Sequence, residues 1–193
     1  MKKILYFTGI MLIGYLLFSQ LLISNNINDS KKEVNMAETQ IATYAAGCFW
    51  GVELKFSKLK GVVSTKVGYM GGKLDNPTYQ DVCYKNTGHA EVCQVVFNPS
   101  EISYEELTKA FFTFHDPTQL NRQGPDVGDQ YRSSIFYHND EQLESAKQII
   151  ENLNKTKFNN RIVTKLEKAE SFWLAEEYHQ KYLQKRGYNS CSY

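Results

Sequence analysis

The sequence has few cysteines and almost no net charge. It contains four cysteines in 193 residues, and 22 Lys and Arg against 21 Asp and Glu leave a formal net charge of +1 at pH 7. A chain this close to neutral creates no field that favours nucleic acid, so we expect no nucleic-acid partner. A chain of this length with 42% hydrophobic residues can bury a core without the disulfides that small secreted scaffolds need. Redox or nucleophilic use of the cysteines therefore competes with structural use.

Charged residues are also missing from 4–23, directly after Lys2 and Lys3. Twenty helical residues span about 30 Å, the thickness of a bilayer core, and the basic flank predicts a cytoplasmic N-terminus. We therefore predict that 1–23 is a transmembrane anchor or an uncleaved signal, with the rest outside the cytoplasm at the cell membrane. A cleaved signal, giving a secreted protein, and a buried helix are the alternatives. The run is longer than a signal's apolar region, and Leu22-Ile23-Ser24 is a poor cleavage site.

Apolar periodicity is absent from residues 24–39, which are polar and rich in Asn and Lys. This composition predicts a flexible tether between the N-terminal segment and the residues that follow. From residue 40 to 193 the chain contains no internal repeat, and its pattern is that of one globular domain.

The pattern from residue 40 onward predicts alternating strands and helices. The period changes from strand to helix at Phe49, glycine at 61 ends that helix, and Ser103 and Glu106 form a capping box. The order β-α-β-β-α-β with additions predicts an α+β fold, a two-layer sandwich with a mixed sheet. Its core is expected to be ferredoxin-like, with long loops and an irregular tail from 187. The predicted strands are 40–45, 62–69, 90–97, 131–137 and 161–166, the later helices begin at 103, 143 and 175, and the long loops are 71–88 and 116–130.

The pentapeptide Gly47-Cys48-Phe49-Trp50-Gly51 lies where the first predicted strand meets the first predicted helix. The reactive form of cysteine is the thiolate, and a helix N-terminus favours an anion. Gly47 allows a sharp turn, while Phe49 and Trp50 supply an aromatic wall that suits a thioether. The alternative is that Cys48 is a small buried apolar residue and Trp50 belongs to the core.

This pentapeptide and seven further blocks, in the same order, resemble the type A peptide methionine sulfoxide reductase family. The similarity runs from about residue 41 to 191 and leaves out the N-terminal segment and the tether. So many ordered blocks are not expected by chance. The further blocks are Gly68-Tyr69-Met70-Gly71-Gly72, Asn76-Pro77-Thr78-Tyr79, Thr87-Gly88-His89-Ala90-Glu91, His115-Asp116-Pro117-Thr118-Gln119, Arg122-Gln123-Gly124-Pro125-Asp126, Gly128-Asp129-Gln130-Tyr131-Arg132-Ser133 and Ala175-Glu176-Glu177-Tyr178-His179-Gln180.

The resemblance implies that 40–193 is a catalytic domain that reduces the S epimer of methionine sulfoxide, free or in proteins. It implies that Cys48 attacks the sulfoxide sulfur and that Glu91 is the acid, with burial raising its pKa. Repair of oxidised proteins follows as a hypothesis, and a monomer is expected. The resemblance also assigns substrate-binding roles, with Tyr79 and Tyr131 on the sulfoxide oxygen, Asp126 fixing the site, and Phe49 and Trp50 around the methyl group.

The resemblance further implies that Cys48 becomes a sulfenic acid and then forms a disulfide with Cys191. A thioredoxin-like protein is expected to reduce that disulfide, with no metal or organic cofactor. The sequence departs from many relatives here, because Asn189 and Ser190 separate the Gly-Tyr pair from Cys191. Cys83 or Cys93 therefore remain alternatives for recycling.

Other interpretations of these residues stay open. Glu91 would be a solvated acid if its strand were an edge strand. The two tyrosines would be packing residues, Asp126 a turn former, and Cys191 a terminal thiol without a catalytic role. A metal site would use Cys83, His89 and Cys93, although this spacing matches no common zinc pattern. The remaining classes are a thiol hydrolase that uses His89, His115 or His179, and a binding module braced by disulfides.

Overall fold

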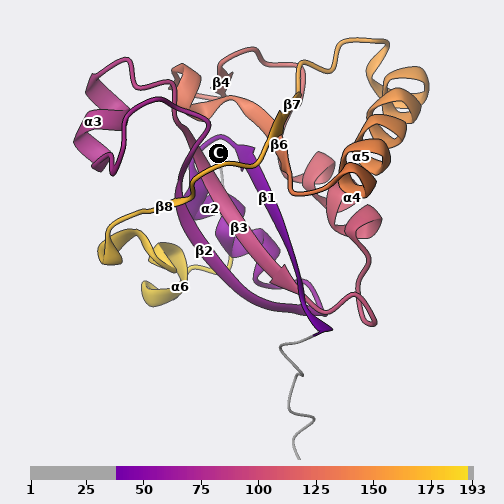
Figure 1. Ribbon diagram of the computed structural model, residues 1–193, viewed down its shortest axis with the longest axis horizontal. Helices are drawn as coiled ribbons and strands as arrows, with labels where there is room; N and C mark the ends of the chain where they lie inside the picture. Colours follow the sequence, from indigo (N-terminus) through magenta and orange to yellow (C-terminus); the bar gives the residue numbers. More distant parts are fainter. Residues whose placement is uncertain (1–37, 191–193) are drawn as a thin grey trace, which may run out of the picture. The chain divides into compact units, whose positions relative to one another are not determined.

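The centre of the fold is a six-stranded mixed sheet within residues 38–190, the part of the chain that this computed structural model describes (Figure 1). Neighbouring strands are antiparallel except for β6 and β7, which are parallel. The α+β fold with a mixed sheet is thus confirmed. The strand order is β7-β6-β1-β3-β2-β8, with β1 at Gln40–Ala46, β2 at Val62–Met70, β3 at Ala90–Phe97, β6 at Ser133–Tyr137, β7 at Lys165–Lys168 and β8 at Trp173–Leu174.

Strands β1 and β3 lie inside the sheet. Strand β1 pairs with β3 on one side and with β6 on the other, and β3 lies between β1 and β2. Strands covered on both faces need apolar residues on both faces, which is why these sequences show no clean polar alternation. Both strands, predicted at 40–45 and 90–97, therefore have a neighbouring strand on each side.

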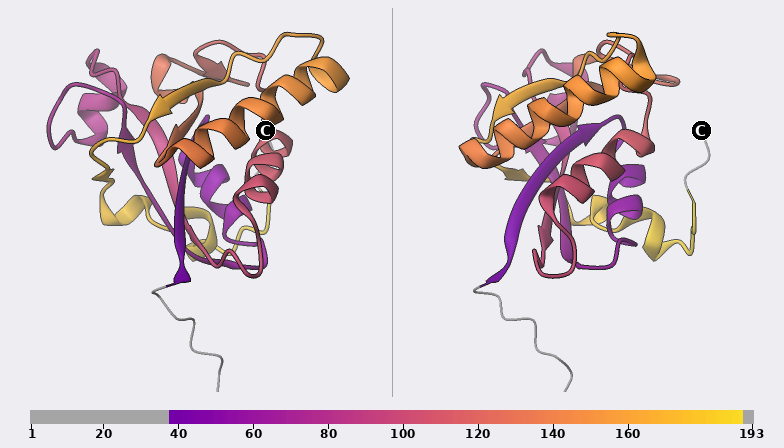
Figure 2. Two further views of the ribbon diagram at one scale, coloured as in Figure 1. Left: turned by 45° about the vertical axis from the view of Figure 1, so that its right-hand side comes forward. Right: turned by 90° about the vertical axis from the view of Figure 1, so that its right-hand side faces the viewer.

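Three helices cover one face of the sheet, and α4 packs against α5 (Figure 2). They are α2 at Phe49–Phe56, α4 at Tyr104–Phe114 and α5 at Asp140–Leu153. The capping box predicted at Ser103 begins α4. Residues 169 and 172 pack over part of the opposite face. The main core on the helical face contains Ala42, Tyr44, Val52, Phe56, Cys93, Val95, Phe97, Leu107, Phe111, Ile135, Ala146 and Ile149, all of them buried.

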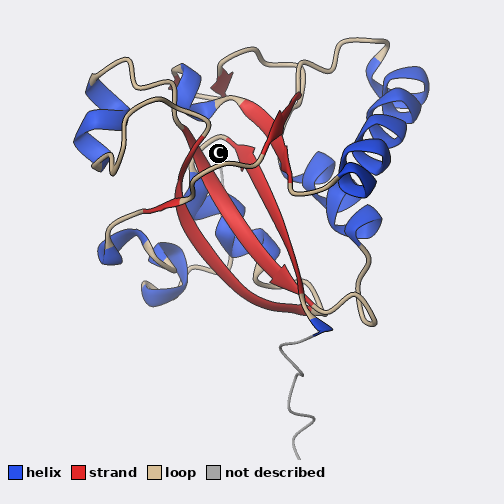
Figure 3. Cartoon of the chain, in the orientation of Figure 1, coloured by secondary structure: helices blue, strands red, loops and turns tan. Residues whose placement is uncertain are grey.

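Short elements occupy the connections between the long ones (Figure 3). None of the helices within residues 38–190 has the length and apolar character needed to cross a bilayer. The predicted membrane segment at 4–23, the predicted tether up to 37 and Cys191 lie outside the described residues. The short elements are α3 at Tyr79–Tyr84, β4 at Arg122–Gln123, β5 at Asp126–Val127, η2 at Asp129–Tyr131, η3 at Asn154–Phe158, η4 at Glu177–His179 and α6 at Tyr182–Lys185.

The helix predicted over 175–185 is wrong. This stretch contains the 3-10 helix η4, a left-handed residue at Lys181 and only then the four-residue α6. The side-chain amide of Gln180 pairs with the backbone of Val67, and Glu53 accepts a hydrogen bond from Lys181 N–H. These contacts tie the segment to β2 and α2 and override its helical periodicity.

Three other predictions need new boundaries. The predicted loop 71–88 contains the six-residue α3. The strand predicted from 131 begins at 133, because Asp129–Tyr131 form the 3-10 helix η2. The strand predicted over 161–166 is β7 at Lys165–Lys168, since pairing with β6 starts only where Lys165 meets Ser134.

Candidate functional site

Cys48 is the N-cap residue of α2, directly after the turn that leaves β1. Gly47 has φ +83°, and a Cβ there would lie 2.7 Å from Cβ of Gln123, so only glycine fits this turn. The thiol is half-buried. The sulfur therefore lies at the positive end of the helix with access to solvent, an arrangement that suits a nucleophilic thiolate.

Glu91 lies beneath the first turn of α2. On β3 it continues the row of Cys93 and Val95, whose side chains face the helices. The side chain is 2% exposed, and its Oε2 accepts a hydrogen bond from Phe49 N–H at 3.0 Å. Burial raises the pKa of Glu91 to about 8; the Phe49 N–H opposes this rise, and the charge of Asp126 adds to it. A carboxyl group that is protonated at neutral pH thus lies next to Cys48.

Two tyrosines and a second thiol lie at the same site. Tyr79 is the first residue of α3, after a capping box at Thr78, and Tyr131 ends η2. Burial raises the pKa of both hydroxyls, and Glu91 and Cys83 raise them further. Burial also raises the pKa of the Cys83 thiol, although hydrogen bonds from both tyrosines oppose this. The two hydroxyls are therefore neutral hydrogen-bond donors at physiological pH.

Asp126 comes from the β4–β5 hairpin, where it pairs with Gln123, the residue that contacts Gly47. It is half-buried, and burial raises the pKa of its carboxyl. Its charge acts on both Glu91 and Tyr131. The structure thus brings residues from four separate segments to one end of α2.

Phe49 and Trp50 form an aromatic wall on the first turn of α2. Phe49 is buried, whereas Trp50 is half-buried and stacks on Tyr182 with ring centroids 3.7 Å apart and planes 6° apart. The indole Nε1–H donates to Nδ1 of His179 at 2.9 Å. The wall is therefore shared between α2 and the C-terminal segment.

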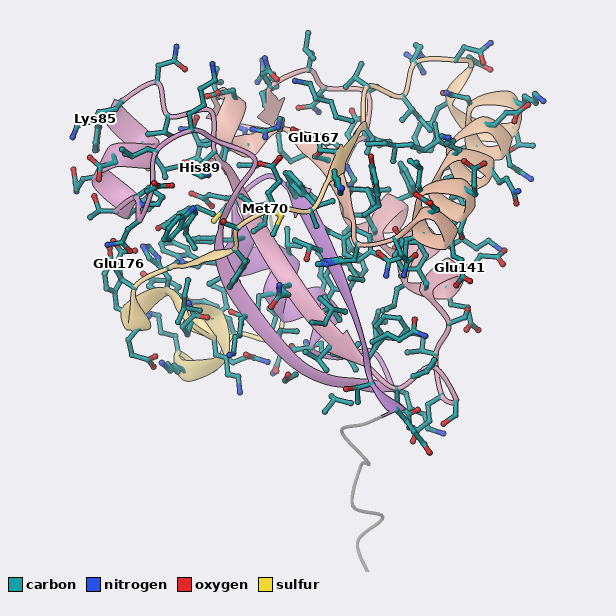
Figure 4. All side chains as sticks on the ribbon, in the orientation of Figure 1. Met70, Lys85, His89, Glu141, Glu167 and Glu176 are labelled. Atoms are coloured by element: carbon teal, nitrogen blue, oxygen red, sulfur yellow. The ribbon has the colours of Figure 1, made fainter. Side chains whose placement is uncertain are left out.

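The C-terminal segment, residues 173–190, was not expected to shape the site. Glu176 accepts hydrogen bonds from the Tyr69 hydroxyl at 3.0 Å and from Tyr79 N–H at 2.9 Å, which ties α3 to β2. Figure 4 shows Glu176 between α3 and α6. The resemblance included the block at 175–180 without assigning it a role. The one feature of this block that could have indicated a role in the site is its high content of aromatic and acidic residues.

Other residues considered from the sequence are used elsewhere. His89 binds the backbone of Gly72 and Leu74 through its two ring nitrogens, and Cys93 is completely buried. His115 contacts Phe111 and Ser133. Within residues 38–190 no group of three His, Cys, Asp or Glu side chains is placed to hold a metal ion. Of the site residues proposed from sequence, only Cys191 lies outside the described range.

Known proteins of one family are similar to this chain. A family model described as "Peptide methionine sulfoxide reductase" matches residues 40–193. A protein of Geobacter metallireducens named "Peptide methionine sulfoxide reductase MsrA" is 54% identical over 157 residues, 81% of this chain and 97% of that protein. Mxr1 from Saccharomyces cerevisiae in reduced form has a TM-score of 0.75 and 42% identity, covering 80% of this chain and 90% of that one. Mxr1 in complex with Trx2 has a TM-score of 0.55 and 32% identity, with 79% and 91% covered.

Proposed function

Because this chain belongs to the peptide methionine sulfoxide reductase family, we propose that it reduces methionine-S-sulfoxide, free and in proteins, with Cys48 as nucleophile. The family membership establishes the enzyme as a peptide methionine sulfoxide reductase. The epimer, the free substrate and the residue roles are the proposal. One observation carries it: the buried, protonated carboxyl of Glu91 lies one hydrogen bond from the backbone N–H that follows Cys48.

In the first proposed step, oxygen passes from the substrate to Cys48. The Cys48 thiolate attacks the sulfoxide sulfur while Glu91 gives its proton to the sulfoxide oxygen. The attack forms a bond between the two sulfurs. The protonated oxygen then moves from the substrate sulfur to the sulfur of Cys48, which breaks both the substrate sulfur–oxygen bond and the new sulfur–sulfur bond, so that Cys48 becomes a sulfenic acid and methionine leaves. The substrate gains two electrons, Cys48 loses two, and Glu91 regains a proton from solvent.

The half-buried tyrosines support recognition of the sulfoxide oxygen. Tyr79 and Tyr131 keep their protons, because burial raises the pKa of each hydroxyl, so both can donate to the oxygen without adding charge. Asp126 acts indirectly, since its charge raises the pKa of Glu91. Phe49 and Trp50 provide the aromatic surface that receives the methyl group.

In the second proposed step, the Cys191 thiol condenses with the Cys48 sulfenic acid. A disulfide and one water molecule form, and a thioredoxin-like dithiol then reduces the disulfide by exchange. The complex of Mxr1 with Trx2 supports this class of reductant. Cys83 is the alternative resolving thiol, because it interacts with both tyrosines of the site. No prosthetic group enters either step.

The experiment that tests this function follows each epimer of a methionine sulfoxide peptide, and of the free amino acid, with dithiothreitol as reductant. The full chain in detergent should consume the S epimer of both and leave the R epimer. Cys48→Ser should be inactive, and Glu91→Gln should be about 100-fold slower or worse. Consumption of the R epimer, or activity in Cys48→Ser, would rule out the proposed mechanism.

A second measurement separates the two resolving thiols. With thioredoxin as reductant, Cys191→Ser should lose turnover, whereas Cys83→Ser should keep it. With dithiothreitol both variants should turn over, because a small thiol reduces the sulfenic acid directly. Loss of thioredoxin-dependent turnover in Cys83→Ser alone would assign the disulfide to Cys83.

Two further parts of the proposal concern the chain as a whole. We propose that 1–23 is a membrane anchor, 24–39 a tether, and that the catalytic domain repairs proteins outside the cytoplasm. The support is the uncharged run at 4–23 behind two lysines. Protease added to intact cells should digest the domain, and protection of the domain would reverse the topology.

We also propose that the core is ferredoxin-like. The support is the strand order β6-β1-β3-β2 within the sheet.

A further inference from the structure

His179 lies at the centre of the aromatic wall, behind the residues that face the substrate. It ends the 3-10 helix η4 and is 1% exposed. Its ring centroid lies 4.6 Å from that of Tyr79, 5.0 Å from Phe49 and 5.6 Å from Trp50. One imidazole ring thus touches three side chains to which substrate contacts are assigned, although it has almost no exposed surface of its own.

The hydrogen bond from Trp50 fixes the form of this imidazole. The indole Nε1–H can only donate, so Nδ1 of His179, at 2.9 Å, must be unprotonated and the ring proton must be on Nε2. Burial lowers the pKa of His179 and keeps the ring neutral. The indole is therefore held at its edge by the Nδ1 acceptor of His179 and on its face by the ring of Tyr182, whose centroid lies 3.7 Å from that of Trp50.

The other ring nitrogen shows that His179 does not itself reach the substrate. Nε2 is buried without a hydrogen-bond partner among the described residues, and Oε2 of Glu176 lies 4.0 Å from it. A buried polar atom left unsatisfied in this way is costly. The histidine of a hydrolase would need an exposed nitrogen, which this residue lacks.

We propose that His179 is a positioning residue that locks the indole of Trp50 as the wall of the methyl pocket. This inference rests on the proposed function. A locked wall binds the methyl group equally in the ground and transition states, so its loss should appear in KM rather than kcat. Without the acceptor, the indole of Trp50 gains rotational freedom, and its Nε1–H must form its hydrogen bond with water instead.

The test compares three variants of the full chain. The oxygen of Asn can accept a hydrogen bond near the position of Nδ1, the amide of Gln reaches the position of Nε2 instead, and Leu removes the acceptor. We expect His179→Leu and His179→Gln to raise KM for the S epimer about tenfold, with kcat within about threefold of wild type. His179→Asn should recover most of the affinity. His138→Leu, at a histidine that bonds Thr43, is the control for loss of an imidazole.

A spectroscopic readout accompanies the kinetics. Amide NMR of labelled protein resolves the two indole signals, and Trp173→Phe identifies the signal of Trp50. In His179→Leu and His179→Gln, the Trp50 Nε1–H signal should shift and exchange faster with water, and His179→Asn should restore it. Equal KM values in the Asn and Gln variants, or an indole signal unmoved by Leu, would overturn the inference while wild-type activity stands. Inactive wild type would instead refute the proposed function.

Discussion

The carboxyl group of Glu91 lies at a site where burial outweighs its hydrogen bond from Phe49, so its pKa rises from 4.5 to about 8. Between these two values the folded protein holds a proton that the unfolded chain releases. Folding stability due to this group is therefore full below about pH 4.5 and is lost as pH rises through about 8. The burial that keeps a proton on Glu91 for the proposed reaction thus makes the fold less stable at alkaline pH.

We predict that Glu91→Gln is more stable than wild type at pH 9, by a few kcal/mol. The reason is that Gln removes a charge that would otherwise be buried. Urea unfolding at pH 5 and pH 9 measures the difference, which should shrink at the lower pH. Glu105→Gln, at an exposed position on α4, is the control and should show no such pH dependence. Equal stability of Glu91→Gln and wild type at pH 9 would contradict the prediction.

A second prediction concerns activity. Because the protonated carboxyl is the acid in the proposed mechanism, kcat/KM should fall about tenfold per pH unit above about pH 8. The charge of Asp126 contributes to the raised pKa of Glu91, so Asp126→Asn should move the midpoint to lower pH. Profiles of kcat/KM from pH 6 to pH 10 measure both effects. An unchanged midpoint in Asp126→Asn would show that the charge of Asp126 does not raise the pKa of the catalytic acid.

At the scale of single elements, two capping boxes begin helices of different importance to the site. Ser103 caps the eleven-residue α4, and Thr78 caps the six-residue α3, which carries Tyr79 and Cys83. Ser103→Ala and Thr78→Ala should each cost about 1 kcal/mol of stability. Only Thr78→Ala should also raise KM, because the cap is next to Tyr79. Urea unfolding and steady-state kinetics measure both effects, and the Ser103 variant is the matched control.

The same two helices show what the sequence can reveal about elements. Helix α4 is long, and its cap has the usual Glu at the third position, so it is predictable. Helix α3 has Asp81 at that position and lies among turn residues, so a loop was expected. The site was largely predictable because ordered motifs carry it. Strand β3 places Glu91 beside α2, in the row of Cys93 and Val95.

Contacts distant in sequence account for what could not be predicted. The stretch 175–185 has helical periodicity, but its backbone is held by Gln180 on Val67 and by Glu53 on Lys181 N–H. The position of His179 follows from these contacts, since the segment must turn at the left-handed Lys181. No local pattern indicates that a side-chain amide will pair with a strand more than a hundred residues away.

For the whole molecule, the dependence of stability on pH is the sum of contributions from titratable groups, some of which act in opposite directions. His115 is half-buried against the ring of Phe111, and desolvation lowers its pKa from 6.5 to about 4. The unfolded chain therefore takes up a proton that the fold excludes, and this loss of stability grows as pH falls from about 6.5 to 4. Glu91 acts in the opposite direction over much of that range.

We predict that stability of wild type changes little between about pH 4.5 and 6.5 and then declines toward pH 8. In Glu91→Gln the His115 contribution is no longer opposed by Glu91, so stability should rise from pH 4 to 6.5 and then level off. Chemical unfolding across pH 4 to 9 compares the two curves. A decline above pH 6.5 in Glu91→Gln would show that a group other than Glu91 causes it.

The amide of Gln180 gives the free edge of the sheet a partner. Its Oε1 accepts from Val67 N–H at 3.0 Å, and its Nε2 donates to Val67 O at 2.9 Å, as a neighbouring strand would. Strand β8 pairs with this edge at Gly68 and Tyr69, and Ala175 N–H also donates to Val67 O. Unpaired strand edges template self-association, so we expect Gln180→Ala to form oligomers on mild heating, measured by light scattering, while Gln184→Ala does not. One side chain would then set how long the enzyme resists aggregation.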